Sequence, residues 1–451
     1  MASAAEQLAA NLNFGAFAKA EELKKRIWFT LAALLVYRLG TYIPIPGINP
    51  TAFAEAFRTQ SSGILGMINM FAGGAIERMA IFALNIMPYI SASIIMQLMQ
   101  SVVPSLEALK KEGEQGRKQL NQYTRYLTVL LASFQALGIA YGLQGQSGGG
   151  VPVVLEPGPF FVLTTVATLV GGTMFLMWLG EQITARGVGN GTSLIIMAGI
   201  VAGLPGAIVG TLDLSRQGVL SWPMLFALAA MMLAVVGVIV FMERAQRRLL
   251  VQYPKRQMGN RMFQGDASHL PLKLNVSGVI PPIFASSLLL LPITVAGFSQ
   301  SGGPEWEWLR AIVAALGRGN PVYLATYVAL IVFFAFFYTS IVLNPQETAD
   351  NLRKYGGFLP GIRPGAKTAA YIDYVLTRIT VVGAIYLSAV CVLPELLTSN
   401  VAGTLYFGGT SLLIAVSVTM DTVAQIQSHL LAHQYEGLIK KAKLRGATRR
   451  I

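Results

Sequence analysis

Residues 64–75 read ILGMINMFAGGA, an apolar stretch that is too short to cross a lipid bilayer. A spanning helix needs about 20 mainly apolar residues, whereas stretches of about 10–14 are often re-entrant or buried in protein. Gly73 and Gly74 interrupt this stretch before the next apolar run. Irregular backbone is tolerated at membrane depth only inside protein or beside a wet cavity. The stretch therefore indicates a segment that fills a central cavity, and the alternative from sequence alone is a fixed interfacial helix.

The composition of the whole chain indicates that lipid is its solvent. Of the 451 residues, 54% are hydrophobic and 12% are charged, while soluble domains carry about 25% charged residues. A soluble fold would have too few polar residues for its surface, but outward-facing Leu, Ile and Phe lose nothing by facing lipid. A soluble domain is therefore excluded. Cys391 is the single cysteine, so the chain forms no intrachain disulfide.

Ten apolar stretches are long enough to span a membrane. They centre on Ala33, Ile90, Leu131, Leu169, Gly199, Met232, Ser287, Ile331, Ala384 and Val416. The polar gaps between them often hold Gly or Pro, as in QSGGGVPVVLEPGP at residues 146–159. The sequence thus predicts an all-α membrane protein with ten transmembrane helices.

The basic residues predict on which side of the membrane each loop lies. The chain has 34 Lys and Arg against 21 Asp and Glu, and cytoplasmic loops carry the excess of Lys and Arg in membrane proteins. With the N-terminus in the cytoplasm, the loops on the opposite side hold only Arg58, Arg216, Arg310 and Arg318. The first twenty residues lack the regions of a secretory signal peptide. We therefore expect both termini in the cytoplasm.

Five predicted spans lie on either side of the loop at 204–221. An odd number of spans per half would invert the second half relative to the first, and inverted repeats commonly place the functional path at their interface. The expected organisation is a cytoplasmic tail (1–26), a first half (27–210) with the short apolar segment (61–76), a second half (211–430) with large cytoplasmic loops (243–275 and 344–373), and a basic cytoplasmic tail (431–451).

Motifs for catalysis, metals and cofactors are missing. His429 and His433 stand four residues apart, but no Glu follows His429 and no third zinc ligand is evident. The stretch GIRPGAKT at 361–368 lacks the spacing of a phosphate loop, and no G-x-S-x-G nucleophile motif occurs. We expect no metal, no cofactor and no enzymatic activity. A membrane-embedded enzyme is therefore only the third hypothesis.

Ionisable residues inside the predicted spans are few. Arg38 lies near the outer end of the first span, and Arg125 and Arg378 lie near cytoplasmic span ends, where snorkelling would satisfy them. Ion-coupled transporters usually place Asp, Glu or Lys near the midplane, because those groups bind the coupling ion. The lack of such a cluster disfavours the second hypothesis, a secondary transporter for a small solute.

Short sequences spread along nearly the whole chain resemble the SecY family. They are IPIPGI (43–48), NMFAGG (69–74), MPYISASII (87–95), KEGE (111–114), QYTRY (122–126), MWLGEQIT (177–184), GVGNG (187–191), HLPLK (269–273), NPQETADNL (344–352), PGIRPG (360–365) and FGGTSLLI (407–414). The resemblance implies two inverted five-helix halves around a central hourglass pore. It also implies a protein-conducting channel that passes unfolded secretory proteins and releases membrane helices laterally into the bacterial inner membrane.

Matched residue by residue, the resemblance implies a ring of mostly apolar residues at the waist of the pore. The ring would consist of Ile86, Ile90, Thr192, Ile196, Ile283 and Ile414. A narrow apolar constriction blocks water and ions by dewetting. Thr192 stands where the family usually has isoleucine, and we expect its hydroxyl to bond a backbone carbonyl one turn earlier with its methyl on the pore. Asn85 stands where glycine is common, and we expect it to face a neighbouring helix.

The same resemblance assigns the short apolar segment as a plug below the ring. Its residues would be Ile64, Leu65, Met67, Ile68, Met70, Phe71, Gly73 and Gly74. The second, third, seventh and eighth spans would form a lateral gate where a signal sequence intercalates, with Gln97, Thr128 and Asn275 as polar candidates at the seam. Hydrogen bonds between membrane helices are worth only about 0.6–2 kcal/mol, so such a seam can open.

The two large loops resemble the family's docking sites for the motor ATPase SecA and the ribosome. The candidates are Lys255, Arg256 and Arg261 in the first loop and Arg363 in the second. Basic side chains neutralise RNA phosphates or acidic protein surfaces, but for most loop lysines topology-setting charge is the favoured explanation. Arg363 stands between PGI and PG, so its backbone is constrained. The resemblance also implies the small membrane subunits SecE and SecG, with signal peptides and nascent chains as ligands and the phospholipid bilayer as surroundings.

Overall fold

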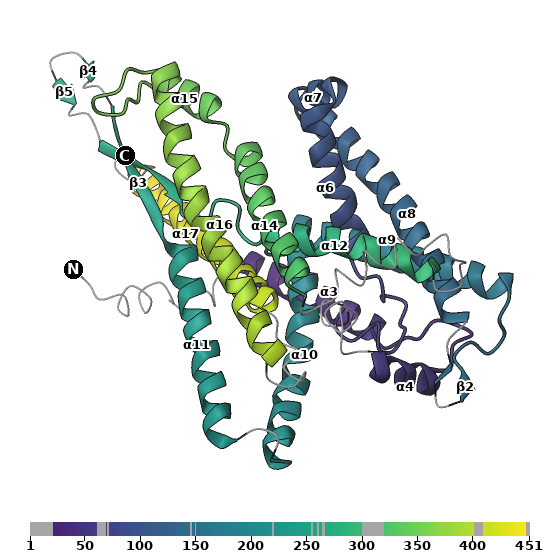
Figure 1. Ribbon diagram of the computed structural model, residues 1–451. Helices are drawn as coiled ribbons and strands as arrows, with labels where there is room; N and C mark the ends of the chain where they lie inside the picture. Colours follow the sequence, from purple (N-terminus) through teal and green to yellow (C-terminus); the bar gives the residue numbers. More distant parts are fainter. Residues whose placement is uncertain are drawn as a thin grey trace. The chain divides into compact units, whose positions relative to one another are not determined.

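The computed structural model describes residues 21–60, 69, 72–144, 147–148, 150–218, 221–253, 256–258, 261–263, 267–299, 320–400 and 409–447. Most of the regular structure in these ranges is α-helical (Figure 1). Each of the ten predicted span centres lies inside one helix. These helices are α3 (Glu21–Gly40), α6 (Met87–Val102), α8 (Glu114–Gln144), α9 (Pro159–Arg186), α10 (Gly191–Arg216), α11 (Trp222–Arg244), α12 (Ile280–Ser299), α14 (Pro321–Val342), α16 (Ala366–Asn400) and α17 (Gly409–Ala447).

Within the described residues, seven helical stretches are long and apolar enough to cross a membrane. An eighth is added if the bent pair of α6 and α7 (Pro104–Lys111) forms one span. The helix α3 is not among them, and α12 qualifies only as a shorter apolar helix over Ile280–Leu289. The chain is therefore a multi-pass helical membrane protein.

Proline marks where many of these helices begin. The first turns of α6, α9, α11 and α14 each contain one, which suits a position whose N–H would find no acceptor within the helix. Pro104 has the further effect of ending α6, because the residue before a proline is pushed out of helical backbone. Val103 is accordingly extended, with φ −97° and ψ 114°, and α6 and α7 meet there at 98°.

Contacts divide the chain into two compact units, Met1–Pro205 with Val418–Ile451 and Gly206–Ser417. In the first unit α8 packs along both α6 and α9, and α3 also packs on α9. In the second unit α14 packs along both α12 and α16. The short helices α4 (Pro50–Gln60) and α15 (Pro345–Lys354) lie between longer ones.

Residues 72–86 of the first unit include the carboxyl end of the short apolar segment and form successive turns that lead to α6. Their backbone bonds to the strand-like stretch that follows α3. The N–H of Ile45 donates to the carbonyl oxygen of Met79 at 2.9 Å, and the N–H of Ile81 donates to that of Ile43, also at 2.9 Å. The polar backbone of this irregular segment is thus satisfied by protein.

Aromatic packing and one glycine seat the same segment against α3 and α9. Phe82 stacks on Tyr37 of α3, with ring centroids 6.3 Å apart, and on Phe175 of α9 at 5.8 Å. A Cβ on Gly172 of α9 would collide with the carbonyl oxygen of Ile81, so only glycine permits this approach. Residues 72–86 are therefore packed inside protein, as non-helical backbone at membrane depth requires.

The two large loops of the second unit are joined to each other. The strand β3 (Gln246–Gln252), which continues from α11, pairs antiparallel with β6 (Ala267–Lys273). Gln252 and Phe358 exchange two backbone hydrogen bonds of 2.9 Å, which link the first loop to the second. A buried apolar cluster ties both loops to α16 and consists of Leu249, Val251, Leu272, Leu359, Ile372, Val375, Leu376 and Ile379. Smaller antiparallel pairs are β4 (Arg256–Met258) with β5 (Arg261–Phe263), and β1 (Ser147–Gly148) with β2 (Val151–Pro152).

Candidate functional site

The short apolar segment is described only at Asn69 and at its carboxyl end. Of its predicted residues, Ile64, Leu65, Met67, Ile68, Met70 and Phe71 lie outside the described residues. Gly73 and Gly74 lie within them and have left-handed backbone, with φ +65° and +80°, which glycine adopts without strain. A Cβ on Gly73 would stand 3.0 Å from the Cα of Gly199 in α10. Glycine is therefore needed here both for the turn and for the close approach of α10.

Side chains of α3 hold this glycine turn. Arg38 Nη1 donates to the carbonyl oxygen of Gly73 at 2.7 Å, and its Nη2 donates to the hydroxyl of Tyr42 at 2.9 Å. The hydroxyl of Tyr37 makes a longer bond of 3.5 Å to the carbonyl oxygen of Ala72. Charge-assisted bonds are the stronger kind. Arg38, which sequence placed only near a span end, thus fixes the junction between the short apolar segment and residues 72–86.

The six ring candidates share one position, since each caps its helix or lies in the first two turns. Ile86 and Ile90 are at the start of α6, Thr192 and Ile196 at the start of α10, Ile283 at the start of α12 and Ile414 at the start of α17. The five isoleucines are buried and Thr192 is half-buried. The first four belong to one compact unit and the last two to the other.

The expected hydrogen bond of Thr192 was wrong. Its hydroxyl donates to Oδ1 of Asn190 at 2.6 Å, not to a backbone carbonyl one turn earlier. Asn190 precedes α10 and also accepts from the N–H of Thr192 at 3.1 Å. A side chain that caps a helix start in this way offers the hydroxyl a nearer acceptor than any carbonyl. A Cβ on Gly180 of α9 would stand 3.3 Å from the Thr192 methyl, so that methyl faces α9.

Asn85 is buried and has left-handed backbone with φ +50°. Side chains other than glycine rarely adopt this conformation, and asparagine is among the few that tolerate it. The backbone therefore explains why glycine suits this position and why asparagine can replace it.

The three gate candidates differ in their bonds. Gln97 Nε2 donates to Ser93 Oγ of the same helix at 3.3 Å, and its buried Oε1 has no hydrogen-bond partner among the described residues. The fully buried Thr128 donates to the carbonyl oxygen of Thr124 at 2.7 Å, one turn earlier in α8. Each of these two bonds therefore lies within a single helix, Gln97 in α6 and Thr128 in α8.

Asn275 lies in the turn between β6 and α12 and bonds to the helix α11. Its Nδ2 donates to Oε1 of Glu243, near the end of α11, at 2.7 Å and to the carbonyl oxygen of Gly278 at 3.1 Å. The hydroxyl of Ser277 donates to Asn275 Oδ1 at 3.2 Å. The Asn275 side chain is thus hydrogen-bonded within its own unit, where it fixes the segment that leads into α12.

The loop candidates are described unevenly. Lys255 lies outside the described residues, and Arg256 and Arg261 lie on the paired strands β4 and β5. Arg363 is exposed on a turn bounded by Gly361 and Gly365, whose φ values are +81° and +105°. The hydroxyl of Thr368 donates to the carbonyl oxygen of Arg363 at 2.9 Å.

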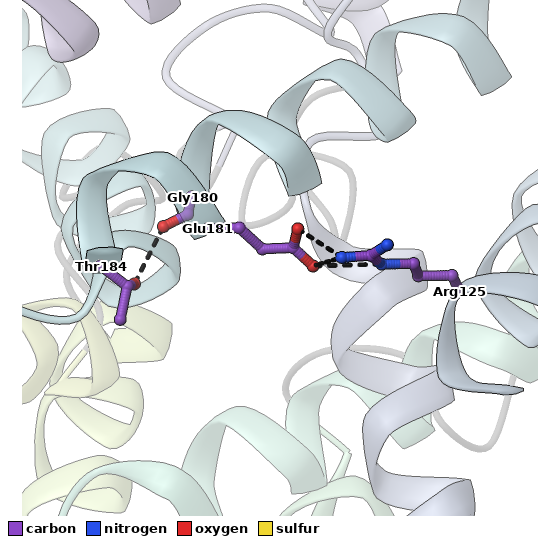
Figure 2. A network of polar contacts seen from close by, with 4 residues as sticks. All are labelled: Arg125, Gly180, Glu181 and Thr184. Carbon is purple, nitrogen blue, oxygen red and sulfur yellow. Dashed lines mark hydrogen bonds and ion pairs between the residues drawn. The ribbon is translucent and has the colours of Figure 1, made fainter. Parts of the chain in front are cut away.

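Arg125 has a partner that the sequence did not indicate. Its guanidinium forms an ion pair with Glu181 of α9, in which Nη2 stands 2.7 Å from Oε2 (Figure 2). Arg378 lies over the ring of Tyr374, 4.2 Å from its centroid. The sequence did offer one signal for this ion pair, because an arginine and a glutamate occur in two different apolar spans. In the described part of the chain, no group of three or more His, Cys, Asp or Glu could hold a metal ion.

Comparison with known proteins places the chain among translocase subunits. A family model described as SecY matches residues 80–423. The protein translocase subunit SecY of Rickettsia conorii is 57% identical over 424 residues, which are 94% of this chain and 97% of that protein. The subunit of the same description from Escherichia coli strain K12 is 53% identical over 425 residues, covering 94% and 96%.

Solved structures share the fold at lower identity. A structure described as a protein conducting channel has a TM-score of 0.64 at 17% identity and covers 90% of this chain and 92% of its own. Sec61 in the canine ribosome-channel complex has a TM-score of 0.61 at 18% identity, with the same coverage. The architecture is therefore the all-helical SecY/Sec61 channel fold.

The left-handed backbone of Asn85 predicts a specific order of stability. Asn85→Gly keeps the conformation, whereas Asn85→Val places a β-branched side chain in a region that costs L-residues about 1–2 kcal/mol. The melting temperature of the purified complex should therefore be lower for the valine variant than for the glycine variant. A valine variant that is as stable as the glycine variant would contradict the strained backbone at this position.

Proposed function

The chain belongs to the SecY family, and on that premise we propose that it is the pore subunit of a bacterial protein translocase. The observation that carries the proposal is identity of more than half to curated protein translocase SecY subunits over 94% of the chain. As such a subunit it would move unfolded secretory proteins across the bacterial inner membrane and release transmembrane segments laterally into it. It would hydrolyse nothing itself.

The proposed architecture has ten spans in two inverted five-helix halves around an hourglass pore. The ten helices that contain the predicted centres, α3 and α12 included, supply the spans. The boundary between the two compact units at residues 205 and 206, inside α10, supports a division close to the predicted one at 210. Both termini would lie in the cytoplasm.

The proposed ring consists of Ile86, Ile90, Thr192, Ile196, Ile283 and Ile414. Branched aliphatic side chains can seal around a moving polypeptide without offering it hydrogen bonds, and a narrow apolar waist excludes water and ions by dewetting. Thr192 would be the weakest member, because its hydroxyl bonds Asn190 and its methyl faces Gly180.

The proposed plug is the short apolar segment at 61–76, and its attachment is the Gly73–Gly74 turn. Two adjacent left-handed glycines allow large changes of backbone angle at little steric cost. The bond from Arg38 to Gly73 would keep this end fixed while the preceding residues leave the pore.

The proposed lateral gate lies between the helix pair α6 and α8 and the pair α12 and α14. Each pair packs together within its own compact unit. Gln97 would supply a buried acceptor, Oε1, that opening or a signal sequence could satisfy. Asn275 and Thr128 would contribute less, since both are engaged within their own unit.

The proposed partners are SecE, SecG, the motor ATPase SecA and the ribosome. The two joined loops would receive SecA or the ribosome through Lys255, Arg256, Arg261 and Arg363. Sec61 and yeast Ssh1 structures of this fold are in complexes with ribosomes, which supports ribosome docking here. Arg363 is the favoured contact because it is exposed on a constrained turn.

A vesicle assay tests the proposed function. Inverted inner-membrane vesicles are prepared from bacteria whose own SecY is depleted, with and without this chain, and receive SecA, ATP and a labelled secretory precursor. Protease-protected precursor should appear only in the vesicles that contain the chain. Equal protection in both preparations, together with saturable uptake of a small solute by the chain alone, would favour the transporter instead.

The docking role of Arg363 is tested against a matched control. Arg363→Glu should lower the initial rate of SecA-driven translocation about tenfold at limiting SecA, because reversal of a central charge weakens a docking contact strongly. Lys367→Glu, which reverses another exposed charge four residues on, in the first turn of α16, should change the rate by less than about twofold. Equal effects of both substitutions would indicate general loop charge and would remove Arg363 from the docking site.

A further inference from the structure

The ion pair of Arg125 and Glu181 joins two membrane helices, α8 and α9. Arg125 Nη2 donates to both carboxylate oxygens, at 2.8 and 2.7 Å, and its Nε lies 3.3 Å from Oε1 (Figure 2). Other ion pairs in the described part of the chain, such as Arg26 with Glu22 and Lys111 with Glu107, join residues within one helix. A forked arginine–carboxylate pair fixes direction as well as distance. The pair therefore adds a directional contact to the packing of α8 on α9.

The residues next to Glu181 form the seat for the start of α10. Gly180 accepts a hydrogen bond from the hydroxyl of Thr184 at 2.9 Å through its carbonyl oxygen (Figure 2). The hydroxyl of Thr184 in turn accepts from the N–H of Gly191 at 2.9 Å. The first N–H groups of a helix lack partners within it, and here α9 supplies one.

The fit of α10 on this seat leaves no spare space. A Cβ on Gly191 would collide with the carbonyl oxygen of Gly180. A Cβ on Gly180 would in turn stand 3.3 Å from the methyl of Thr192. A displacement of α9 at residues 180–184 must therefore move the start of α10, whose first two turns carry Thr192 and Ile196.

We propose that Arg125 and Glu181 are positioning residues that couple α8 to the first turn of α10. The inference rests on the proposed function, in which α8 belongs to the lateral gate and Thr192 and Ile196 belong to the ring. Movement of α8 during gate opening is passed through the ion pair to α9 and through the Gly180–Thr184 seat to the ring residues. Loss of the pair frees α8 from α9 and loosens the resting position of α10.

The test measures a ring position two helices away from the substitution. In a Cys391→Ala background, Ile196→Cys is placed in the whole complex and its rate of maleimide labelling is measured without substrate. Arg125→Glu and Glu181→Arg each set like charges against each other and should raise the labelling rate about fivefold, a population change within reach of one such pair. The double variant, which restores opposite charges, should return the rate to within about twofold of the parent.

Three comparisons make the outcome decisive. Arg117→Glu reverses an exposed charge on the same helix, and it should leave the labelling rate unchanged. Melting temperatures of all variants separate general unfolding from a local effect, because general unfolding would lower the melting temperature as well as raise the labelling rate. Single reversals that behave like Arg117→Glu would overturn the coupling while leaving translocation by the parent intact, whereas absent translocation by the parent would count against the proposed function itself.

Discussion

A backbone N–H or C=O that meets lipid without a hydrogen-bond partner costs several kcal/mol, and this constraint governs the irregular residues 72–86. A helix satisfies the hydrogen bonds of its own backbone, but a run of turns needs donors and acceptors from other segments. Here the stretch after α3 supplies backbone bonds, Arg38 bonds Gly73, and Gly172 lets α9 approach closely. Two residues in this run other than glycine, Met79 and Asn85, have left-handed backbone with φ +43° and +50°. Strain of this kind persists only where the surroundings over-determine it, and it gathers at functional sites.

The same constraint bears on how helices could begin beside the proposed apolar path. The first N–H groups of a helix need acceptors, yet an acceptor on the path would bind a passing polypeptide. At α10 the acceptors belong to Thr184 and Asn190. The N–H of Gly189, just before it, donates to Gln425 of α17 at 2.9 Å. The N–H groups at the start of α10 thus find acceptors in α9, α17 and the preceding turn, as the proposed ring requires.

Sequence predicted the helices well because hydropathy and length report directly on lipid contact, and all ten predicted centres lie in helices. It did not predict the bonds that position the candidate site, since those join residues far apart in the chain. Arg38 bonds a carbonyl 35 residues away, and Arg125 meets a carboxylate 56 residues away. The predicted hydrogen bond of Thr192 was wrong for a local reason. It assumed a carbonyl acceptor inside a helix, whereas Asn190 caps the start of α10 and accepts the bond instead. Arg363 stays a prediction: the structure places it exposed on a turn between two left-handed glycines, but its docking role depends on a partner.

Photocrosslinking along a stalled secretory chain tests most directly that polypeptide passes the proposed ring. A photoreactive residue is placed at Ile90, at Ile283 or at Leu233, which is 74% exposed on the apolar helix α11. The account predicts adducts with the stalled chain from Ile90 and from Ile283, and none from Leu233. Translocation proven under way with no adduct at Ile90 or Ile283 would contradict it.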